Sequence, residues 1–254
     1  MTDAAVTRRE GEGAWSAGDK RLGNRLLEGL SAAERRLVEP HLQPVTLRRG
    51  AVLFEPGDDV HTTYFPTGHA MVSLRLVTRE GEAIEVATIG REGAVGGVVS
   101  AGDKPAFGQA VVQIEGRALA IATDRLDSIK HDRPAVRDLV SRFADALLAQ
   151  LMQSAACNAL HSVDQRCARW LLAAHDRAGE RGLPLTQEAL AEMLGVQRTT
   201  VTVVSGRLQQ AGLIRARRGA VEIVDREGLE RAACECYAAV EGHYRRLLPE
   251  VSQA

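Results

Sequence analysis

The stretch LTQEALAEMLGVQRTTVTVVSGRLQQAGLIRARR, residues 185–218, decides how the rest of the chain is interpreted. Its first part predicts a short helix, because Thr186 is a suitable N-cap and apolar residues follow it at helical spacing. Gly195 then permits a tight turn. The next segment predicts a second helix, whose buried face is formed by Val201, Val204 and Leu208. Two short helices joined by a glycine turn predict a helix-turn-helix motif.

The other face of the second helix carries side chains suited to reading DNA. Arg198 is the best candidate for a base contact, since its guanidinium fork matches the O6 and N7 atoms of guanine. Gln197 is either a further reader or a helix cap. The full set predicted to read bases is Arg198, Thr199, Thr202 and Gln197. Contacts to the DNA backbone position a protein without specifying a sequence, and we assign them to Arg207, Arg217, Arg218 and Thr200.

A basic hairpin follows the second helix. Residues 213–215 and 220–224 flank the sequence Arg217-Arg218-Gly219, which predicts a two-stranded wing with arginines at its tip. Five arginines stand against two glutamates between residues 186 and 220, whereas the net charge of the whole chain is −1. The positive charge is therefore local, as expected of a DNA-binding module attached to a neutral domain.

Composition and length limit the class of protein. The 254 residues, 45% of them hydrophobic and 26% charged, predict a soluble chain of about two domains. No apolar run approaches the roughly 18 residues of a membrane span, and the start of the chain lacks the apolar region of a signal peptide. Four cysteines in a chain of this length do not indicate a secreted disulfide framework. We therefore expect a cytoplasmic protein with no membrane partner.

The segment before residue 124 predicts a β domain. Asn24 begins a short predicted helix, and Ser31 with Glu34 predicts a capping box at the start of another. Short β-branched or alternating runs follow, separated by glycine-rich turns, at residues 45–47, 51–54, 62–65, 71–76, 84–89, 110–114 and 118–122. Many short strands with regular turns predict a sandwich, jelly roll or barrel.

From residue 134 the periodicity becomes helical. Apolar residues at alternating spacings of four and three predict one long helix over residues 134–160 with a heptad-like seam. We interpret this helix as a dimerisation helix, although it could instead pack on its own β domain. The interface residues predicted on the seam are Val136, Val140, Phe143, Leu147 and Ser154. A further helix near residues 163–177 leads to the helix-turn-helix, and a single packing helix is expected at the end of the chain.

The order of β-roll, long helix and winged helix-turn-helix resembles the Crp/Fnr family of bacterial transcription regulators over residues 22–227. Two local motifs carry the resemblance: Gly57-Asp58 followed by Tyr64-Phe65 and Gly68, and the run Gly195-Val196-Gln197-Arg198-Thr199-Thr200-Val201 followed by Leu-x-x-x-Gly-Leu-Ile. It implies an α+β fold with an N-terminal cyclic-nucleotide-binding-type β-roll, or jelly roll. It also implies a homodimer on a palindromic operator in double-stranded DNA, an effector signal at the β-roll, and RNA polymerase as a partner.

The resemblance divides the chain into five parts. The predicted domains are a mobile tail (1–20), a β-roll effector domain (21–133), a long dimerisation helix (134–160), a winged helix-turn-helix (161–228) and a C-terminal packing helix (229–254). In the recognition helix, the places where relatives often carry a glutamate and a second arginine are here Thr199 and Val203. The operator should therefore differ from that of the catabolite activator.

The expected cyclic-nucleotide site is altered. Relatives that bind cyclic nucleotides carry a Gly-Glu-Leu motif and then an Arg-Ser or Arg-Thr pair, whose arginine holds the cyclic phosphate. Here residues 90–97 match the first part, but the stretch Phe107-Gly108-Gln109-Ala110 has no arginine. Without this arginine, the phosphate of cyclic AMP would lose its bidentate partner, which disfavours binding of cyclic AMP. The identity of the effector therefore stays open. The residues assigned to an effector pocket are Gly90, Glu92, Gly93, Gly96 and Gln109.

Metal and redox chemistry find little support in the sequence. The first cysteine is Cys157, so the N-terminal iron–sulfur ligands of oxygen-sensing relatives are missing. Cys234 and Cys236 are too close for an ordinary zinc or cluster set and lack a second pair. Helical spacing predicts Cys236 in the core and Cys234 at its rim. The candidate haem ligands are His41, His61, His69 and Met71, which we interpret as ordinary loop or edge residues.

Two rival functions stay open. One is a regulator controlled by a partner protein, or by no ligand at all, through a degenerate β-roll. The other, more remote, is a cupin-like metalloenzyme, which needs a tight His-x-His, whereas His61 and His69 are eight residues apart. The sequence has no Gly-x-Ser-x-Gly motif, Walker loop or Cys-x-x-Cys pair. We therefore predict a protein that is not an enzyme and has no metal or cofactor.

Overall fold

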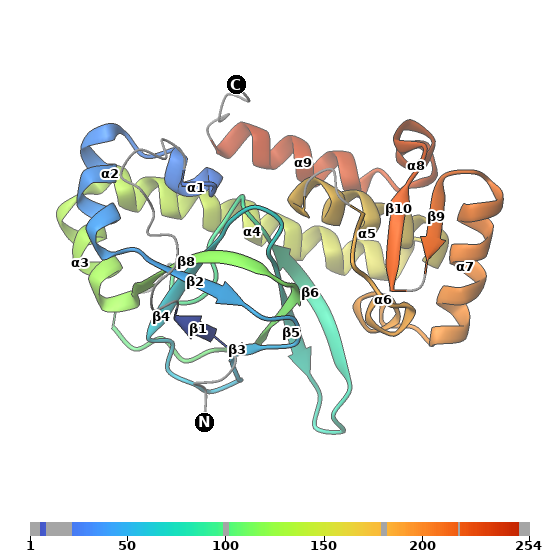
Figure 1. Cartoon of the computed structure of the whole chain (residues 1–254), viewed down its shortest axis with the longest axis horizontal. Coiled ribbons are helices and arrows are strands. Elements are labelled where there is room, and N and C mark those ends of the chain that lie inside the picture. Colours follow the sequence, from blue (N-terminus) through green and yellow to red (C-terminus); the bar gives the residue numbers. More distant parts are fainter. Residues whose placement is uncertain (1–5, 9–21, 99–101, 179–181, 218, 249–254) are drawn as a thin grey trace.

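The computed structural model describes residues 6–8, 22–98, 102–178, 182–217 and 219–248. A β-rich domain and a helical domain lie side by side, and the long helix α4 (Pro134–Leu160) runs along both (Figure 1). In these ranges no helix combines the length and the apolar character that crossing a bilayer requires.

The β domain is a roll of two facing antiparallel sheets. Within the described residues the first sheet has the order β1 (Val6–Arg8), β2 (Gln43–Leu47), β8 (Gly116–Ala122) and β4 (Thr62–Pro66). The second has the order β3 (Val52–Phe54), β7 (Gln109–Ile114), β5 (Met71–Val77) and β6 (Ala83–Ile89). The seven runs predicted as strands are confirmed, and so is the α+β class with a β-roll.

Strand β1 corrects one expectation. The sequence predicts a tail without structure over residues 1–20, and most of these lie outside the described residues. Val6–Arg8, however, pair antiparallel with β2, with Val6 opposite Leu47 and Arg8 opposite Val45. Two β-branched residues in this triplet suit the open edge that β2 offers, which explains why the segment is a strand.

Around Met71 and Val72 the second sheet is buried on both faces. Successive strand residues point to opposite sides, so Val72 enters the interior of the roll while its neighbour Met71 enters the core of the helical domain. The helix that covers this outer face is α5 (Val163–Ala178), through buried side chains that include Cys167 and Leu171. The β-roll and the helical domain therefore share a packed interface.

Short helices close the other side of the roll. They are α1 (Arg25–Glu28), α2 (Ala32–Val38), the 3-10 turn η1 (Glu39–His41) and α3 (Thr123–Asp132). The capping box predicted at Ser31 is confirmed: its backbone N–H donates to Glu34 Oε2 at 2.9 Å, and the backbone N–H of Glu34 donates to Ser31 Oγ at 3.3 Å. Asn24 caps α1 by accepting a hydrogen bond from the Leu27 N–H at 3.1 Å.

The C-terminal region contains α6 (Gln187–Leu194), α7 (Arg198–Gln210), β9 (Ile214–Arg217), β10 (Ala220–Ile223), α8 (Arg226–Ala232) and α9 (Cys236–Leu247). The prediction of a single final helix is therefore wrong, because the chain breaks between α8 and α9. Cys234 lies in this break and is buried, so its predicted position at the rim is also wrong. Helix α9 then runs alongside α4 (Figure 1).

Helix α4 has the predicted bounds, but its seam faces inward. The five residues assigned to a dimer interface are fully or partly buried within the chain: Val136, Val140, Phe143, Leu147 and Ser154. Phe143 is 0% exposed, and a Cβ at Gly93 would stand 2.2 Å from its ring. Heptad spacing identifies a face that is covered, but not what covers it. The alternative interpretation, packing on its own β domain, is the correct one for this seam.

Candidate nucleic-acid interface

Helices α6 and α7 are joined by a turn that requires glycine. Thr186 caps α6 by accepting a hydrogen bond from the Ala189 N–H at 3.2 Å. Gly195 then adopts φ 62° and ψ 43°, the left-handed region that other residues enter at a cost. A Cβ there would also approach Ile84 Cδ1 of β6 to 3.2 Å. The turn is therefore fixed both by its backbone and by the β-roll beside it.

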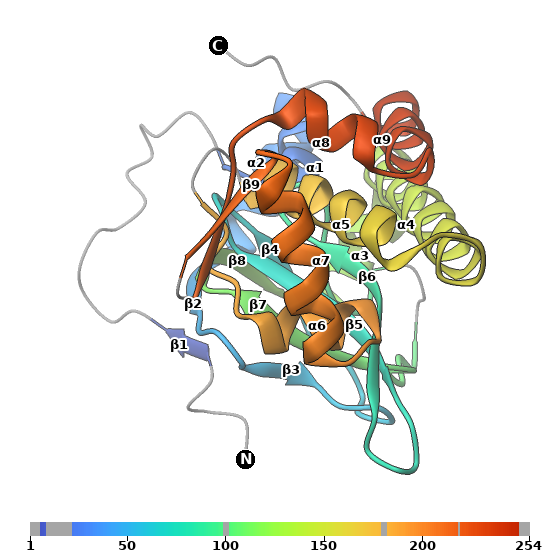
Figure 2. The same ribbon diagram turned by 90° about the vertical axis from the view of Figure 1, so that its right-hand side faces the viewer.

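Helix α7 has a buried face and an open face. Its buried apolar side chains are Val201, Val204 and Leu208, at 5% exposure or less. Thr199, Thr202 and Arg207 are exposed on the other side, and Val203 is 52% exposed. Figure 2 shows α7 in front of the molecule with the β9–β10 hairpin beside it. The open face is therefore accessible together with the wing.

Arg198 stands at the start of α7. Its Nη1 lies 2.5 Å from Glu188 Oε1 of α6, and both side chains are more than half exposed. Exposed ion pairs of this kind contribute little stability, so the guanidinium can exchange this carboxylate for a base at little cost. Gln197 occupies the N-cap position but makes no capping hydrogen bond with its side chain. Thr202 Oγ1 donates to Gln187 Oε1 at 2.9 Å.

The wing is attached to the end of α7. The backbone N–H of Ala216 in β9 donates to Gln209 Oε1 of α7 at 2.9 Å. Arg217 lies on β9 with its Nη2 3.8 Å from Glu222 Oε2, and Arg218 lies outside the described residues. Arg207 reaches from α7 to Asp164 at 3.1 Å, close to the start of α5. The described arginines of this surface are thus exposed and held by exchangeable carboxylates.

The helix-turn-helix is docked on the β-roll through polar contacts. Arg75 Nη1 of β5 lies 2.5 Å from Glu192 Oε1 of α6. Trp170 Nε1 of α5 donates to Glu85 Oε1 of β6 at 2.7 Å. Burial raises the pKa of Glu85, against hydrogen bonds from Ser73 and Trp170 that lower it. An arginine of the roll therefore contacts α6, and a buried carboxyl of the roll contacts α5, which leads into the reading helices.

Glu92 does not line the predicted effector pocket. Its Oε1 lies 2.8 Å from Arg177 Nε of α5, and both side chains are at most 9% exposed. Burial opposes the charge of Arg177, but the Glu92 carboxylate outweighs it and raises the pKa of the guanidinium. A Cβ at Gly90 would stand 2.8 Å from the Cβ of Arg177. Gly90, Glu92 and Gly93 therefore serve packing between domains, which corrects their assignment to a ligand pocket.

A real pocket lies next to these residues. It has a volume of about 470 Å³, and its apolar lining includes Phe54, Leu74, Ile89, Phe107, Leu147 and Leu151. Of the predicted pocket residues only Gly96 borders it, because Gln109 turns to Glu55. The cations at its wall are both paired: Arg75 with Glu192, and Lys104 with Asp127 at 2.6 Å. The wall is thus mainly apolar, with no phosphate-binding arginine where relatives carry one.

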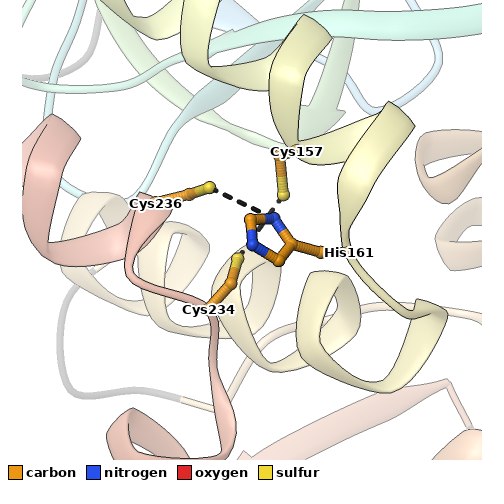
Figure 3. Close-up of side chains that lie close together, drawn as sticks. All are labelled: Cys157, His161, Cys234 and Cys236. Atoms are coloured by element: carbon orange, nitrogen blue, oxygen red, sulfur yellow. Dashed lines mark hydrogen bonds between the residues drawn. The ribbon is translucent and has the colours of Figure 1, made fainter.

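Sequence reasoning missed one cluster. Cys157 and His161 of α4 lie next to Cys234 and Cys236, and their four ligand atoms are within 4.8 Å of one another (Figure 3). The prediction that Cys234 and Cys236 lack a second pair is therefore wrong. The only local signal was the spacing of four between Cys157 and His161, which places both on one face of a helix. Of the haem candidates, Met71 is buried beneath α5.

Comparison with known proteins identifies the group to which this architecture belongs. Residues 165–232 match the Crp-like helix-turn-helix domain. TTHA1359, a transcriptional regulator of the CRP/FNR family from Thermus thermophilus, superposes with a TM-score of 0.60 at 23% identity, covering 75% of this chain and 98% of that one. Residues 165–232 thus carry a helix-turn-helix domain of Crp type, and the chain shares the fold of CRP/FNR regulators.

Further relatives agree with this assignment. The CRP-like cAMP-activated global transcriptional regulator of Mycobacterium tuberculosis is 27% identical over 218 residues, which are 82% of this chain and 96% of that protein. The structure of FixK2 from Bradyrhizobium japonicum superposes with a TM-score of 0.66 at 14% identity, covering 76% and 98% of the two chains. The relatives are transcription regulators and not enzymes, and the helix-turn-helix domain that the sequence predicts is confirmed by the family match.

Proposed function

We propose that this Crp/Fnr regulator binds a palindromic operator as a homodimer, reads bases with α7, and is controlled by a signal at the β-roll. The observation that carries the proposal is the two-sided α7: one face anchors it in the core while Arg198, Thr199 and Thr202 stay exposed beside the wing. A recognition helix enters the major groove by its N-terminal residues, where these side chains lie. Genome-wide mapping of bound DNA would give the operator on which this proposal is tested.

The exposed residues suggest what the operator contains. Arg198 fits a guanine in each half-site, because its fork matches O6 and N7. Val203 is exposed one turn after Thr199 on α7. Its side chain fits the C5-methyl group of thymine, which is an apolar group in the major groove. Arg207, Arg217 and Arg218, with Thr200, are proposed to contact phosphates. The family's usual arginine at the Val203 position is missing, so the sequence preference should be distinct.

We expect Arg198→Ala to lose about 1–3 kcal/mol of specific binding, roughly 5- to 150-fold at 25 °C, and to relax preference at one position per half-site. Fluorescence anisotropy with the mapped operator and with single-base variants measures both effects. Arg231→Ala is a matched control, because Arg231 is an exposed arginine of α8 in the same domain. Equal losses on the operator and on random duplex would refute base reading by Arg198.

Arg217→Ala should behave differently. A phosphate contact positions the protein on any sequence, so binding to specific and random DNA should weaken together. The slope of log K against log salt should flatten by about 1 for each phosphate that the variant no longer neutralises. Titrations at several salt concentrations measure this slope. A change confined to one base position would instead make Arg217 a base reader.

The dimer is proposed to form through the outer face of α4. Its exposed apolar residues follow the heptad spacing of four, three and four: Leu148, Met152, Ala155 and Ala159. At about 3.6 residues per turn this stripe lies opposite the buried seam. A second copy of α4 would cover it and place two α7 helices on one side of the dimer, and a palindromic operator requires two such reading helices.

The signal is proposed to be a small apolar molecule in the pocket of about 470 Å³. Its wall includes Leu147 and Leu151 of α4, and Arg75, which also binds Glu192 of α6. An occupant can therefore influence both the dimer helix and the reading head. Thermal-shift measurements with apolar ligands and nucleotides separate this from control by a partner protein, since a bound ligand raises the melting temperature. We further propose a cytoplasmic location and contact with RNA polymerase.

A further inference from the structure

Four side chains with metal-binding atoms meet where α4 ends and α9 begins. Cys157 comes from the last turn of α4 and His161 is the C-cap of that helix. Cys234 comes from the break after α8, and Cys236 from the first turn of α9. The Sγ atoms of Cys157 and Cys234 are 3.5 Å apart, and Cys236 Sγ is 3.5 Å from His161 Nδ1. The side chains point toward one another in Figure 3. These two separations already match those of ligands around a single ion.

We propose that Cys157, His161, Cys234 and Cys236 bind one zinc ion. Three thiolates and one imidazole are a typical donor set for tetrahedral zinc. With Zn–S near 2.3 Å and Zn–N near 2.0 Å, a tetrahedron places its donor atoms about 3.5–3.8 Å apart. The separation of 3.5 Å between the two sulfurs is far from the roughly 2.05 Å of a disulfide. A single ion therefore suits the cluster better than a covalent bond.

Neighbouring groups orient the ligands as zinc sites require. His161 Nε2 lies 3.2 Å from Glu235 Oε1, which leaves Nδ1 directed at the sulfurs. A carboxylate behind a ligating histidine is a recurrent feature of zinc sites. Gln153 Nε2 donates to Cys236 Sγ at 3.0 Å, a contact that favours a thiolate. The three cysteines are at most 4% exposed, so the ion would be closed off from solvent, as in structural rather than catalytic sites.

The location defines what the ion does. Cys234 and Cys236 follow residue 232, where the match to the Crp-like helix-turn-helix domain ends. His161 is the C-cap of α4 and lies in the short junction between α4 and α5. Zinc here fastens the C-terminal helix to the end of α4, at the point where the chain enters the DNA-binding domain. Because such a site forms only when the chain is folded, the binding energy of zinc adds to stability.

Metal analysis of the purified full chain tests this proposal directly. We expect about one zinc per chain, and intense thiolate-to-metal absorption when cobalt replaces zinc. Cys157→Ser and Cys234→Ser should lose the metal. Cys167→Ser is the matched control, because Cys167 is equally buried but lies on α5, in the core of the helical domain and outside the cluster. It should keep its zinc.

A conservative variant covers the case in which the cysteine variants fail to fold. Glu235→Gln changes an exposed side chain and should weaken zinc binding by about 10- to 100-fold in competition with a chromophoric chelator. Removing zinc should lower the melting temperature of the wild type and of Cys167→Ser. Four results would overturn the proposal: no binding on titration with zinc or cobalt, iron with sulfide, a Cys157–Cys234 disulfide, or full zinc content in Cys157→Ser.

Discussion

Arg177→Ala is expected to lower the free energy of unfolding by about 3–5 kcal/mol, since it leaves the buried Glu92 carboxylate without its partner. Arg177 contacts side chains from the β-roll, from α4 and from α9. It pairs with Glu92 of the β-roll at 2.8 Å, donates to Gln150 Oε1 of α4 at 3.1 Å, and lies over the Tyr244 ring of α9 at 6.0 Å. Alanine removes all three contacts at once. Denaturant unfolding followed by circular dichroism measures the loss.

Controls separate the ion pair from the general effect of shortening an arginine. Arg36→Ala, at an exposed position of α2, should change stability by no more than about 0.5 kcal/mol. Combining Arg177→Met with Glu92→Leu should restore much of the loss, because replacing both charges by apolar side chains removes the uncompensated buried carboxylate. If Arg177→Ala lost no more than Arg36→Ala, the pair would not stabilise the interface between domains.

Local patterns predict the parts of the fold that local physics controls. The capping box at Ser31 depends on residues three positions apart, and the left-handed Gly195 ends a helix whose apolar spacing stops there. Seven of the eight described strands of the roll, set off by glycine turns, are predicted for the same reason. Helix α4 begins at Pro134, which suits the first turn of a helix.

The spacing of apolar residues along a helix does not show which segment covers its buried face. The spacing correctly places the seam of α4 on one side of a helix but suggests a second copy as its cover, whereas Phe143 is buried against the loop at Gly93, 50 residues earlier in the sequence. The resemblance locates Glu92, but only the fold directs it to Arg177, 85 residues away. The pocket of about 470 Å³ is likewise bounded by side chains from several strands and from α4, which only the fold brings together.

The cysteine cluster shows the same limit most clearly. Cys157 with His161, and Cys234 with Cys236, are each too small a set to indicate a metal site. The sulfurs of Cys157 and Cys234 meet across 77 residues because α9 returns along α4 (Figure 1). A helix pairing of that range leaves no periodic signal in the sequence.

Met152→Glu is expected to convert the protein from a dimer to a monomer at micromolar concentration. Met152 is 66% exposed at the centre of the outer stripe of α4, so a second copy would place two such glutamates together in an apolar contact. Burying unpaired charge is costly, which makes the associated state unfavourable. Light scattering coupled to size-exclusion chromatography measures the mass. Because the side chain is exposed in the single chain, thermal unfolding of the monomer should change little.

The loss of the dimer should also reduce DNA affinity. Two reading helices joined on one operator bind more tightly than one alone, by about 10²- to 10⁴-fold, and the monomer forfeits this gain. Single half-sites should be bound equally by both proteins, and full operators should show half-sites roughly 34 Å apart. Arg142→Glu is the matched control, since Arg142 is exposed on α4 away from the stripe. A Met152→Glu protein that stays dimeric would show that the subunits associate elsewhere, and a monomeric wild type would show that this face binds no second copy.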